Sequence, residues 1–177
     1  MNYKKLDLAE LRKLAEARDP KARLELADRY RWGKGVERSE EEEHKWVRLA
    51  ALQGYAEAQY LWGSHYQYSW EKKQRRLAIK WYKKAAEQGY AGAEIALGDC
   101  YCSGELVRKD EVKAFNWYKK AAERGDSWAQ NSLGFCYENG IGVEADRYTA
   151  SYWYKQSADQ GFPYGIENYE RLFHSVI

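Results

Sequence analysis

Three histidines and three cysteines are the residues of this chain best suited to metal binding or nucleophilic chemistry. His44, His65 and His174 lie far apart, and none belongs to a His-Glu-x-x-His pair that would bind zinc from one helix face. The sequence also contains no Gly-x-Ser-x-Gly nucleophile motif and no Walker phosphate loop. These observations predict structural or surface histidines and a protein that is not an enzyme, with no cofactor and no metal.

A repeat of about 36 residues positions these side chains. Four tryptophans are each followed by a small pair and a glycine, and they stand 35, 36 and 36 residues apart: Trp46, Trp81, Trp117 and Trp153. The register divides the chain into repeats at 20–55, 56–90, 91–126 and 127–162, with capping helices at 1–19 and 163–177. We therefore predict one repeat domain over residues 1–177.

Each repeat reads as two helices. In the third repeat, one stripe holds Ala93, Leu97, Gly98 and Tyr101, and a second holds Ala114, Trp117, Tyr118, Ala121 and Ala122. Asp110 and Asp146 are predicted N-caps, and Ser39 followed by Glu42 has capping-box spacing. Glycines are placed to end the second helices in a left-handed conformation. They are Gly54, Gly89, Gly125 and Gly161.

Small residues on the first helices predict close helix approach. Gly63, Gly98 and Gly134 recur at one repeat position, where Ala27 stands in the first repeat. One hairpin cannot bury its own apolar face, so the hairpins must stack. The predicted fold is an all-α, right-handed α/α superhelical solenoid of four complete helix-turn-helix repeats with helical caps.

The cysteines are predicted to be free thiols. Cys100, Cys102 and Cys136 are an odd number crowded into one third of the chain, which argues against a disulfide framework and for a reducing compartment. Cys100 and Cys136 hold equivalent positions in adjacent repeats. Helix packing would separate them by about 8–10 Å or more, beyond disulfide reach.

The repeated motifs resemble a known family. Gly-x-Gly-Val loops, Lys-Ala, Trp-Tyr, Ala-Ala and a closing Gly over residues 20–162 are similar to the Sel-one-like repeat (SLR) family, relatives of tetratricopeptide proteins. The second repeat departs from the pattern at Ser69, Trp70 and Glu71, and the third at Leu106. The resemblance implies a scaffold or adaptor that binds a partner protein in a concave groove. Small bacterial relatives act as immunity proteins, and some cysteine-rich exported relatives bind or hydrolyse β-lactams.

In tetratricopeptide-like stacking the first helices line the inner curve, which nominates a partner-binding surface. Trp128 is the clearest candidate, because its equivalents are Lys21, Glu57 and Gly92. An apolar row with a polar rim suits a protein interface. The predicted partner-binding residues are Leu24, Asp28, Tyr60, Ile95, Asp99, Trp128, Asn131, Phe135 and Tyr164. An alternative face is formed by the loops near Trp32, Tyr68 and Trp70.

Composition excludes several classes of partner. The chain has 29 Lys and Arg residues and 27 Asp and Glu residues, so its net charge is 29 − 27 = +2. This near balance provides no basic footprint for nucleic acid or an anionic membrane. Charge runs such as Lys83-Lys84 are predicted to be solvated. No run approaches the ~18 apolar residues of a spanning helix. We expect a cytoplasmic monomer or weak dimer, with a bacterial immunity protein or regulator as candidate roles. The alternative is a β-lactam-binding hydrolase, which the missing cysteine pairs disfavour.

Overall fold

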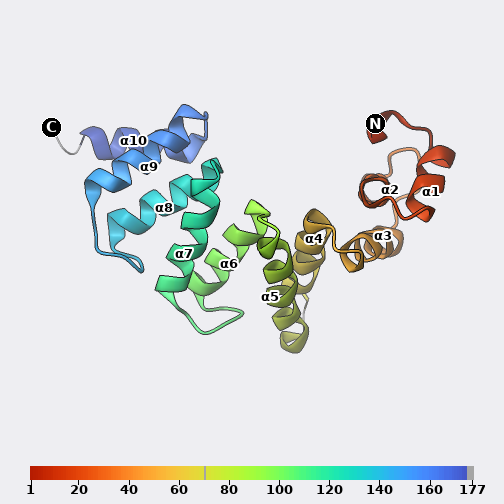
Figure 1. The fold of residues 1–177 in the computed structure, drawn as a ribbon, viewed down its shortest axis with the longest axis horizontal. Helices are drawn as coiled ribbons and strands as arrows, with labels where there is room; N and C mark the ends of the chain where they lie inside the picture. Colours follow the sequence, from red (N-terminus) through yellow and green to blue (C-terminus); the bar gives the residue numbers. More distant parts are fainter. Residues whose placement is uncertain (70, 175–177) are drawn as a thin grey trace. The chain divides into compact units, whose positions relative to one another are not determined.

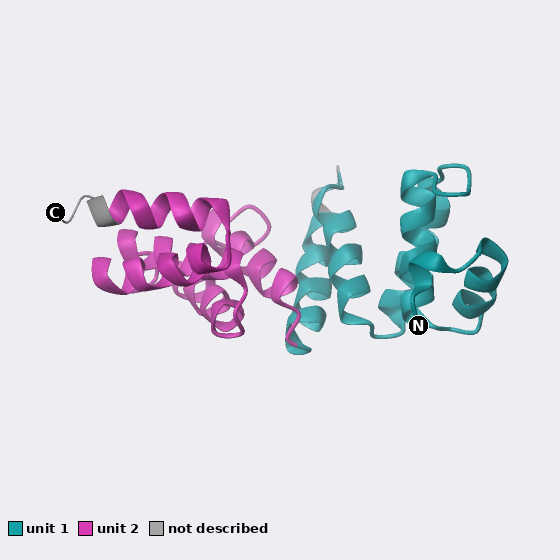
Figure 2. Cartoon of the chain, turned by 90° about the horizontal axis from the view of Figure 1, so that it is seen from above, with its two compact units in different colours: residues 1–88 teal, residues 89–177 magenta. Residues whose placement is uncertain are grey.

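The computed structural model describes residues 1–69 and 71–174, apart from the side chains of residues 72, 73, 173 and 174. Within this part of the chain the fold is entirely helical, without a strand, so the all-α class predicted from sequence is confirmed. The helices form two compact units, residues 1–88 and 89–177, coloured teal and magenta in Figure 2. Each unit is described separately below.

Unit 1 consists of a cap and two helix pairs (Figure 1). A 3₁₀ turn, η1 (Tyr3–Lys5), precedes the capping helix α1 (Leu8–Glu16), which packs on α2. The first pair is α2 (Pro20–Trp32) with α3 (Glu40–Leu52), and the second is α4 (Ala56–Gln67) with α5 (Lys72–Glu87). Leu11 and Ala15 of α1 are fully buried, which closes the apolar end of the first pair.

Unit 2 repeats this plan. Helix α6 (Ala91–Ser103) pairs with α7 (Glu111–Glu123), and α8 (Ser127–Asn139) pairs with α9 (Arg147–Asp159). The last helix, α10 (Pro163–His174), packs on both α9 and α8 and buries Leu172. The predicted C-terminal cap is therefore helical, while the side chain of Phe173, expected to continue its stripe, lies outside the described residues.

Helix starts follow the predicted caps. Asp110 accepts a hydrogen bond from the Lys113 backbone N–H at 3.0 Å, and Ser39 accepts one from that of Glu42 at 3.2 Å. Asp146 caps α9 in the same way. The reciprocal half of the expected capping box is not made. The Glu42 carboxylate accepts from the Trp46 indole at 2.9 Å instead, and the Ser39 N–H donates to a backbone carbonyl.

The glycine that recurs on the first helices packs directly against a tyrosine ring of the paired helix. A Cβ at Gly98 would lie 2.5 Å from Tyr118 Cε1, and the same relation holds between Gly63 and Tyr82 and between Gly134 and Tyr154. In the first repeat Ala27 takes the glycine position and Val47 the tyrosine position, and both are buried. In this repeat the larger Ala27 on the first helix is matched by the smaller Val47 on the second helix, as complementary packing requires.

Two backbone positions depart from the repeat. Gly54 and its three equivalents have positive φ, as predicted, but the matching residue after α1 is Arg18, with φ 70°. A side chain in this conformation is strained. In the third repeat, Leu106 replaces a loop glycine and is buried, at 8% exposure, so this loop follows a path that holds an apolar side chain. Trp70, in the divergent second loop, lies outside the described residues.

Candidate functional site

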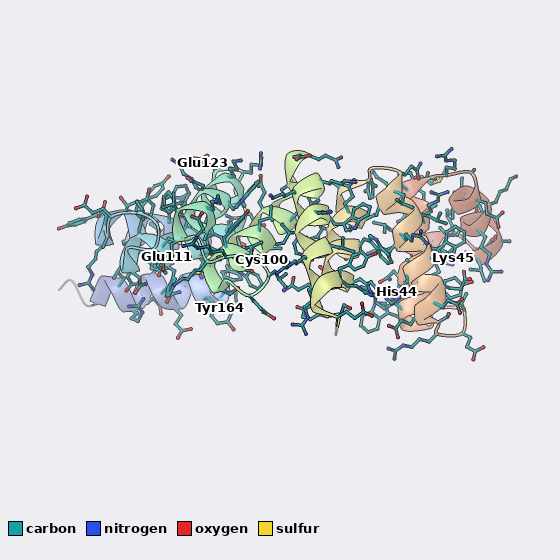
Figure 3. All side chains as sticks on the ribbon, turned by 90° about the horizontal axis from the view of Figure 1, so that it is seen from below. His44, Lys45, Cys100, Glu111, Glu123 and Tyr164 are labelled. Atoms are coloured by element: carbon teal, nitrogen blue, oxygen red, sulfur yellow. The ribbon has the colours of Figure 1, made fainter. Side chains whose placement is uncertain are left out.

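Three exposed aromatic residues gather on one face of unit 2. Trp128 and Phe135 stand seven residues apart on α8, which places them on the same side of the helix. Their exposed fractions are 55% and 49%. Tyr164, at the start of α10, is 63% exposed and projects from the helices in Figure 3. We call this surface the α8–α10 face. It also includes Asn131, Glu138, Phe162, Asn168 and Arg171.

Phe162 joins two of these aromatics and was missed by the sequence reasoning. Its ring centroid lies 6.0 Å from that of Trp128 and 5.7 Å from that of Tyr164. Phe162 itself is half-buried and lies next to both exposed rings. The repeat register held a signal, because Tyr55 and Tyr90 occupy the equivalent positions.

Polar side chains join α8 to α10 beside the aromatics. Arg171 donates to both oxygens of the Glu138 carboxylate, at 2.8 and 2.7 Å, and Asn168 donates to Asn131 at 2.9 Å. The hydroxyl of buried Tyr154 also donates to Glu138, at 2.8 Å. The hydrogen bond from Arg171 is the main reason that the pKa of Glu138 lies below its ordinary value. The carboxylate is therefore held ionised and oriented.

The other predicted contact residues of unit 2 are engaged within the fold. Ile95 is half-buried against the apolar core of the unit. Asp99 accepts a hydrogen bond from the Tyr118 hydroxyl at 2.7 Å. Burial, together with this bond, raises the pKa of Tyr118. Asp99 thus accepts the hydrogen bond of the tyrosine hydroxyl whose ring packs against Gly98, although Asp99 itself is exposed.

In unit 1, two of the predicted residues line a groove of about 880 Å³. Leu24 and Asp28 of α2 lie along it, together with Leu61 of α4. Asp28 forms an ion pair with Lys34 at 2.8 Å. The ring of the third predicted residue, Tyr60, instead lies 5.7 Å from that of Tyr82, within its own repeat.

A second groove of unit 1, of about 650 Å³, brings together two histidines that sequence spacing separates. His44 of α3 and His65 of α4 have ring centroids 3.9 Å apart, and the His65 ring stacks on Trp62 at 4.9 Å. Burial and the neighbouring His44 lower the pKa of His65. His174, the third histidine, has a side chain outside the described residues. Across the residues that the structure describes, no cluster of His, Cys, Asp or Glu is suited to a metal ion.

The cysteines are free thiols in the structure. Cys100, labelled in Figure 3, and Cys136 are buried at 4% and 1% exposure, and Cys102 is half-buried. Burial raises the pKa of Cys100 and of Cys136 to about 12. These thiols pack as small apolar side chains and are poor nucleophiles at neutral pH.

The alternative loop surface also carries exposed aromatics. Trp32 is 65% exposed and Tyr68 is 82% exposed, but the two come from different repeats. Trp70, the third residue of that prediction, lies outside the described residues. Tyr148 and Tyr152 on α9, which the sequence reasoning did not single out, are exposed as well.

A Ser-x-x-Lys spacing from Ser69 to Lys72 was overlooked in the sequence. Such a pair bears on β-lactam chemistry when both residues share one helix face. Here Ser69 precedes α5, which begins at Lys72. The Ser69 hydroxyl donates to the Gln74 side chain at 3.1 Å and accepts from the Glu71 backbone at 3.3 Å. These bonds connect the Ser69 hydroxyl to the residues around the start of α5.

Comparisons with known proteins agree with the repeat architecture. The Sel1 repeat matches residues 20–55, 56–90, 91–126 and 129–162. The solved structure of c5321, a protective antigen of uropathogenic Escherichia coli with an SLR fold, has 34% identity and a TM-score of 0.85. The similarity covers 93% of this chain and 36% of that one. A Sel1 repeat protein from Oxalobacter formigenes has 35% identity and a TM-score of 0.75, covering 81% and 59%.

A third structure, immunity protein Pa5087 from Pseudomonas aeruginosa, shares the fold at 21% identity, with a TM-score of 0.55 and coverage of 88% and 74%. The chain spans about a third of the Escherichia coli antigen and under two thirds of the Oxalobacter protein. The search of curated proteins found no match. None of the described helices is long and apolar enough to span a bilayer.

Four consecutive matches to one repeat, and solved structures with the same paired helices, confirm the resemblance seen in the sequence. The chain belongs to the Sel1 repeat family.

Proposed function

We propose that this protein binds a partner protein through the α8–α10 face. The observation that carries the proposal is the exposure of Trp128 and Tyr164 next to the half-buried Phe162, with Phe135 also exposed two turns further along α8. The positions equivalent to Trp128 and Phe135 hold polar residues or glycine in the other repeats, so the stacking of helices does not require aromatics there. Clustered exposed aromatics favour association, and such residues supply most of the energy of protein interfaces.

The polar part of the face fits the same role. Arg171 is held by a bidentate pair with Glu138 and keeps 51% of its side chain exposed. The guanidinium is therefore oriented before a partner arrives, which lowers the entropy lost on binding. Asn131 and Asn168 add an amide pair between the two helices. An aromatic centre with an ordered polar edge matches the anatomy of a specific interface.

The predicted residues in the rest of the chain enter the proposal as secondary contacts. Leu24 and Asp28 line the larger groove of unit 1, which could take part of a peptide or loop of the partner. Tyr60, Ile95 and Asp99 have most of their described interactions within the fold, so we assign them smaller contributions.

The class of partner is inferred from relatives. Sel1 repeats serve in protein–protein interaction, and the fold of this chain is shared with the immunity protein Pa5087. We propose a dedicated protein partner, and a toxin neutralised by this chain is one such case. The proposal requires neither a cofactor nor a reaction. It places the protein in a reducing compartment such as the cytoplasm, where its three thiols would stay free.

The test uses affinity capture with the intact chain to find the partner, followed by titration calorimetry of purified components. Trp128→Ala and Phe135→Ala should each weaken binding by about 2 kcal/mol, or roughly 30-fold, as hot-spot residues do. Tyr152→Ala is the matched control, since Tyr152 is 56% exposed but lies on α9. It should bind within twofold of the wild type.

Circular dichroism would verify that all three variants are folded. Wild-type affinity in both the Trp128 and Phe135 variants would refute the α8–α10 assignment. An equal loss with Tyr152→Ala would refute it too, because the effect would then belong to exposed aromatics in general.

A further inference from the structure

Helix α5 concentrates positive charge in a chain of low net charge. Seven Lys and Arg residues lie between positions 72 and 84, and the first acidic residue after them is Glu87. The net charge of the whole chain is only +2. The balanced composition therefore conceals one locally basic segment.

Packing sorts the residues of α5 into two faces. Ala78, Ile79 and Tyr82 are buried against the rest of unit 1. The opposite face exposes four basic side chains at spacings of four, three and one residues, which form one stripe along the helix: Arg76, Lys80, Lys83 and Lys84. The stripe extends about 12 Å along the helix axis.

These cations are not neutralised by the fold. Among the described residues, none of the four has a carboxylate within 4 Å, and the Lys84 ammonium lies over the Trp81 ring at 4.6 Å. On other second helices, exposed lysines do find acidic partners. Lys119 pairs with Glu123 at 3.8 Å, and Lys155 pairs with Asp159 at 2.8 Å.

Lys119 and Lys155 hold the same repeat position as Lys83, so the comparison is between equivalent sites. Like charges three or four residues apart on a helix repel one another. Glu87 stands four residues after Lys83, as Glu123 and Asp159 do after Lys119 and Lys155, but among the described residues it forms no ion pair with Lys83 or Lys84. Arg76 and Lys80 have no acidic residue three or four positions away on α5. An anionic partner would remove the repulsion.

The length and surroundings of the basic stripe indicate which class of anionic partner it fits. The apolar residues of α5 are buried in the core, so the helix has no apolar face to insert into a lipid surface. The full row does not recur from repeat to repeat. The Lys83 position is basic in the other repeats too, as Arg48, Lys119 and Lys155, but the positions equivalent to Arg76 are Glu41, Val112 and Tyr148. A polynucleotide backbone needs a longer basic track than one helix face. A single acidic helix laid along α5 fits its length and spacing.

We propose that the outer face of α5 (Arg76, Lys80, Lys83 and Lys84) docks an acidic helical segment of a partner protein. Carboxylates on one face of that segment would pair with the stripe. This surface is separate from the α8–α10 face in sequence and chemistry, so either can fail without the other.

The experiment measures fluorescence anisotropy of a labelled Ala-based helical peptide of about 20 residues, with glutamates at i, i+4 and i+7 on one face. An isomer of the same composition, with its glutamates spread around the helix, is the peptide control. In 150 mM salt, the striped peptide should bind at least tenfold more tightly than the isomer. Raising the salt to 500 mM should abolish this binding, because the contacts are exposed ion pairs.

Lys80→Glu/Lys83→Glu should weaken binding of the striped peptide at least tenfold. Lys119→Glu/Lys155→Glu changes the net charge equally and should have an effect of less than twofold. Should the first variant fail to fold, Lys80→Gln/Lys83→Gln removes the cations more gently and should still weaken binding at least threefold.

Equal binding of the two peptides, or equal losses in the two charge-reversal variants, would overturn the proposal. Tighter binding of a 20-base-pair DNA duplex or of phosphatidylserine vesicles than of the striped peptide, in the same 150 mM salt, would overturn it as well.

Discussion

Replacing Gly98 by Ala should test the packing that joins the two helices of a repeat. The added Cβ would lie 2.5 Å from Cε1 and 2.7 Å from Cδ1 of Tyr118, whereas ordinary contacts are 3.4–4 Å. The ring must therefore retreat by about 1 Å to reach a normal contact distance. It cannot do so freely, because Tyr118 is 5% exposed and its hydroxyl is bonded to Asp99 at 2.7 Å.

Three contributions set the size of the effect. Overpacking of a filled core costs about 1–3 kcal/mol. Disturbing the hydrogen bond to the Asp99 carboxylate adds about 1.5–3 kcal/mol. Alanine is favoured over glycine inside a helix by about 1 kcal/mol, which offsets part of the loss. The expected decrease in the free energy of unfolding is about 3 kcal/mol, and Gly98→Leu should decrease it further.

The first repeat suggests the compensating change. There, Ala27 and Val47 occupy the positions of Gly98 and Tyr118. Tyr118→Val alone should cost about 3 kcal/mol through the cavity that it leaves. In the double variant, the alanine would enter the space vacated by the ring. The double variant should therefore be more stable than the sum of the single effects implies, with a coupling energy of about 2 kcal/mol or more.

Urea unfolding at 25 °C, followed by both circular dichroism and tryptophan fluorescence, would supply the four free energies of this cycle. Agreement of the two probes would support two-state analysis. Ala27→Gly is the control, since it creates no clash and should cost only about 1 kcal/mol in helix propensity. A coupling energy below about 0.5 kcal/mol would mean that Gly98 and Tyr118 act independently, and the close-packing argument would be refuted.

Further predictions concern the thiols, the backbone and catalysis. Titration in denaturant without reductant should find three free thiols, and in native protein at pH 8 Cys100 and Cys136 should react at least tenfold more slowly than Cys102; a count of one would contradict this. The buried thiols have a folded pKa of about 12 against an ordinary value of 9.0, so the unfolded chain ionises first as pH rises. Their stabilising contribution should be intact below pH 9 and be lost between pH 9 and 12, which urea midpoints at pH 8 and 10 would check. Arg18→Gly should stabilise the protein by about 1 kcal/mol by relieving the positive φ, and an unchanged melting temperature would argue against strain there. Nitrocefin should not be hydrolysed above the buffer rate, and turnover that Ser69→Ala abolishes would instead favour the hydrolase alternative.

Much of the local structure followed from short-range patterns. The N-caps at Asp110 and Asp146 and the positive φ at Gly54 depend on residues within one helical turn, so the spacing alone was sufficient to predict them. The exposure of Trp128 and Phe135 was also predictable, because the repeat register compares each position with its equivalents. The Phe162 link was not predicted, since it depends on the turn that brings α10 to α8.

The sequence by itself determined that this chain forms stacked helical pairs. The 36-residue register repeats the apolar stripes, the small residues allow close helix contact, and a single pair cannot bury its apolar face alone. Only the tertiary structure decided which polar side chains remain available for a partner. Asp99 is a predicted contact residue and Glu138 lies on the α8–α10 face, yet each accepts a hydrogen bond from a buried tyrosine hydroxyl of the paired helix. His44 and His65, which share no motif, become neighbours because α3 packs against α4. The physical reason is that a buried hydroxyl or ring takes whichever partner the packing places within about 3–4 Å, and that distance is set by residues far away in the chain.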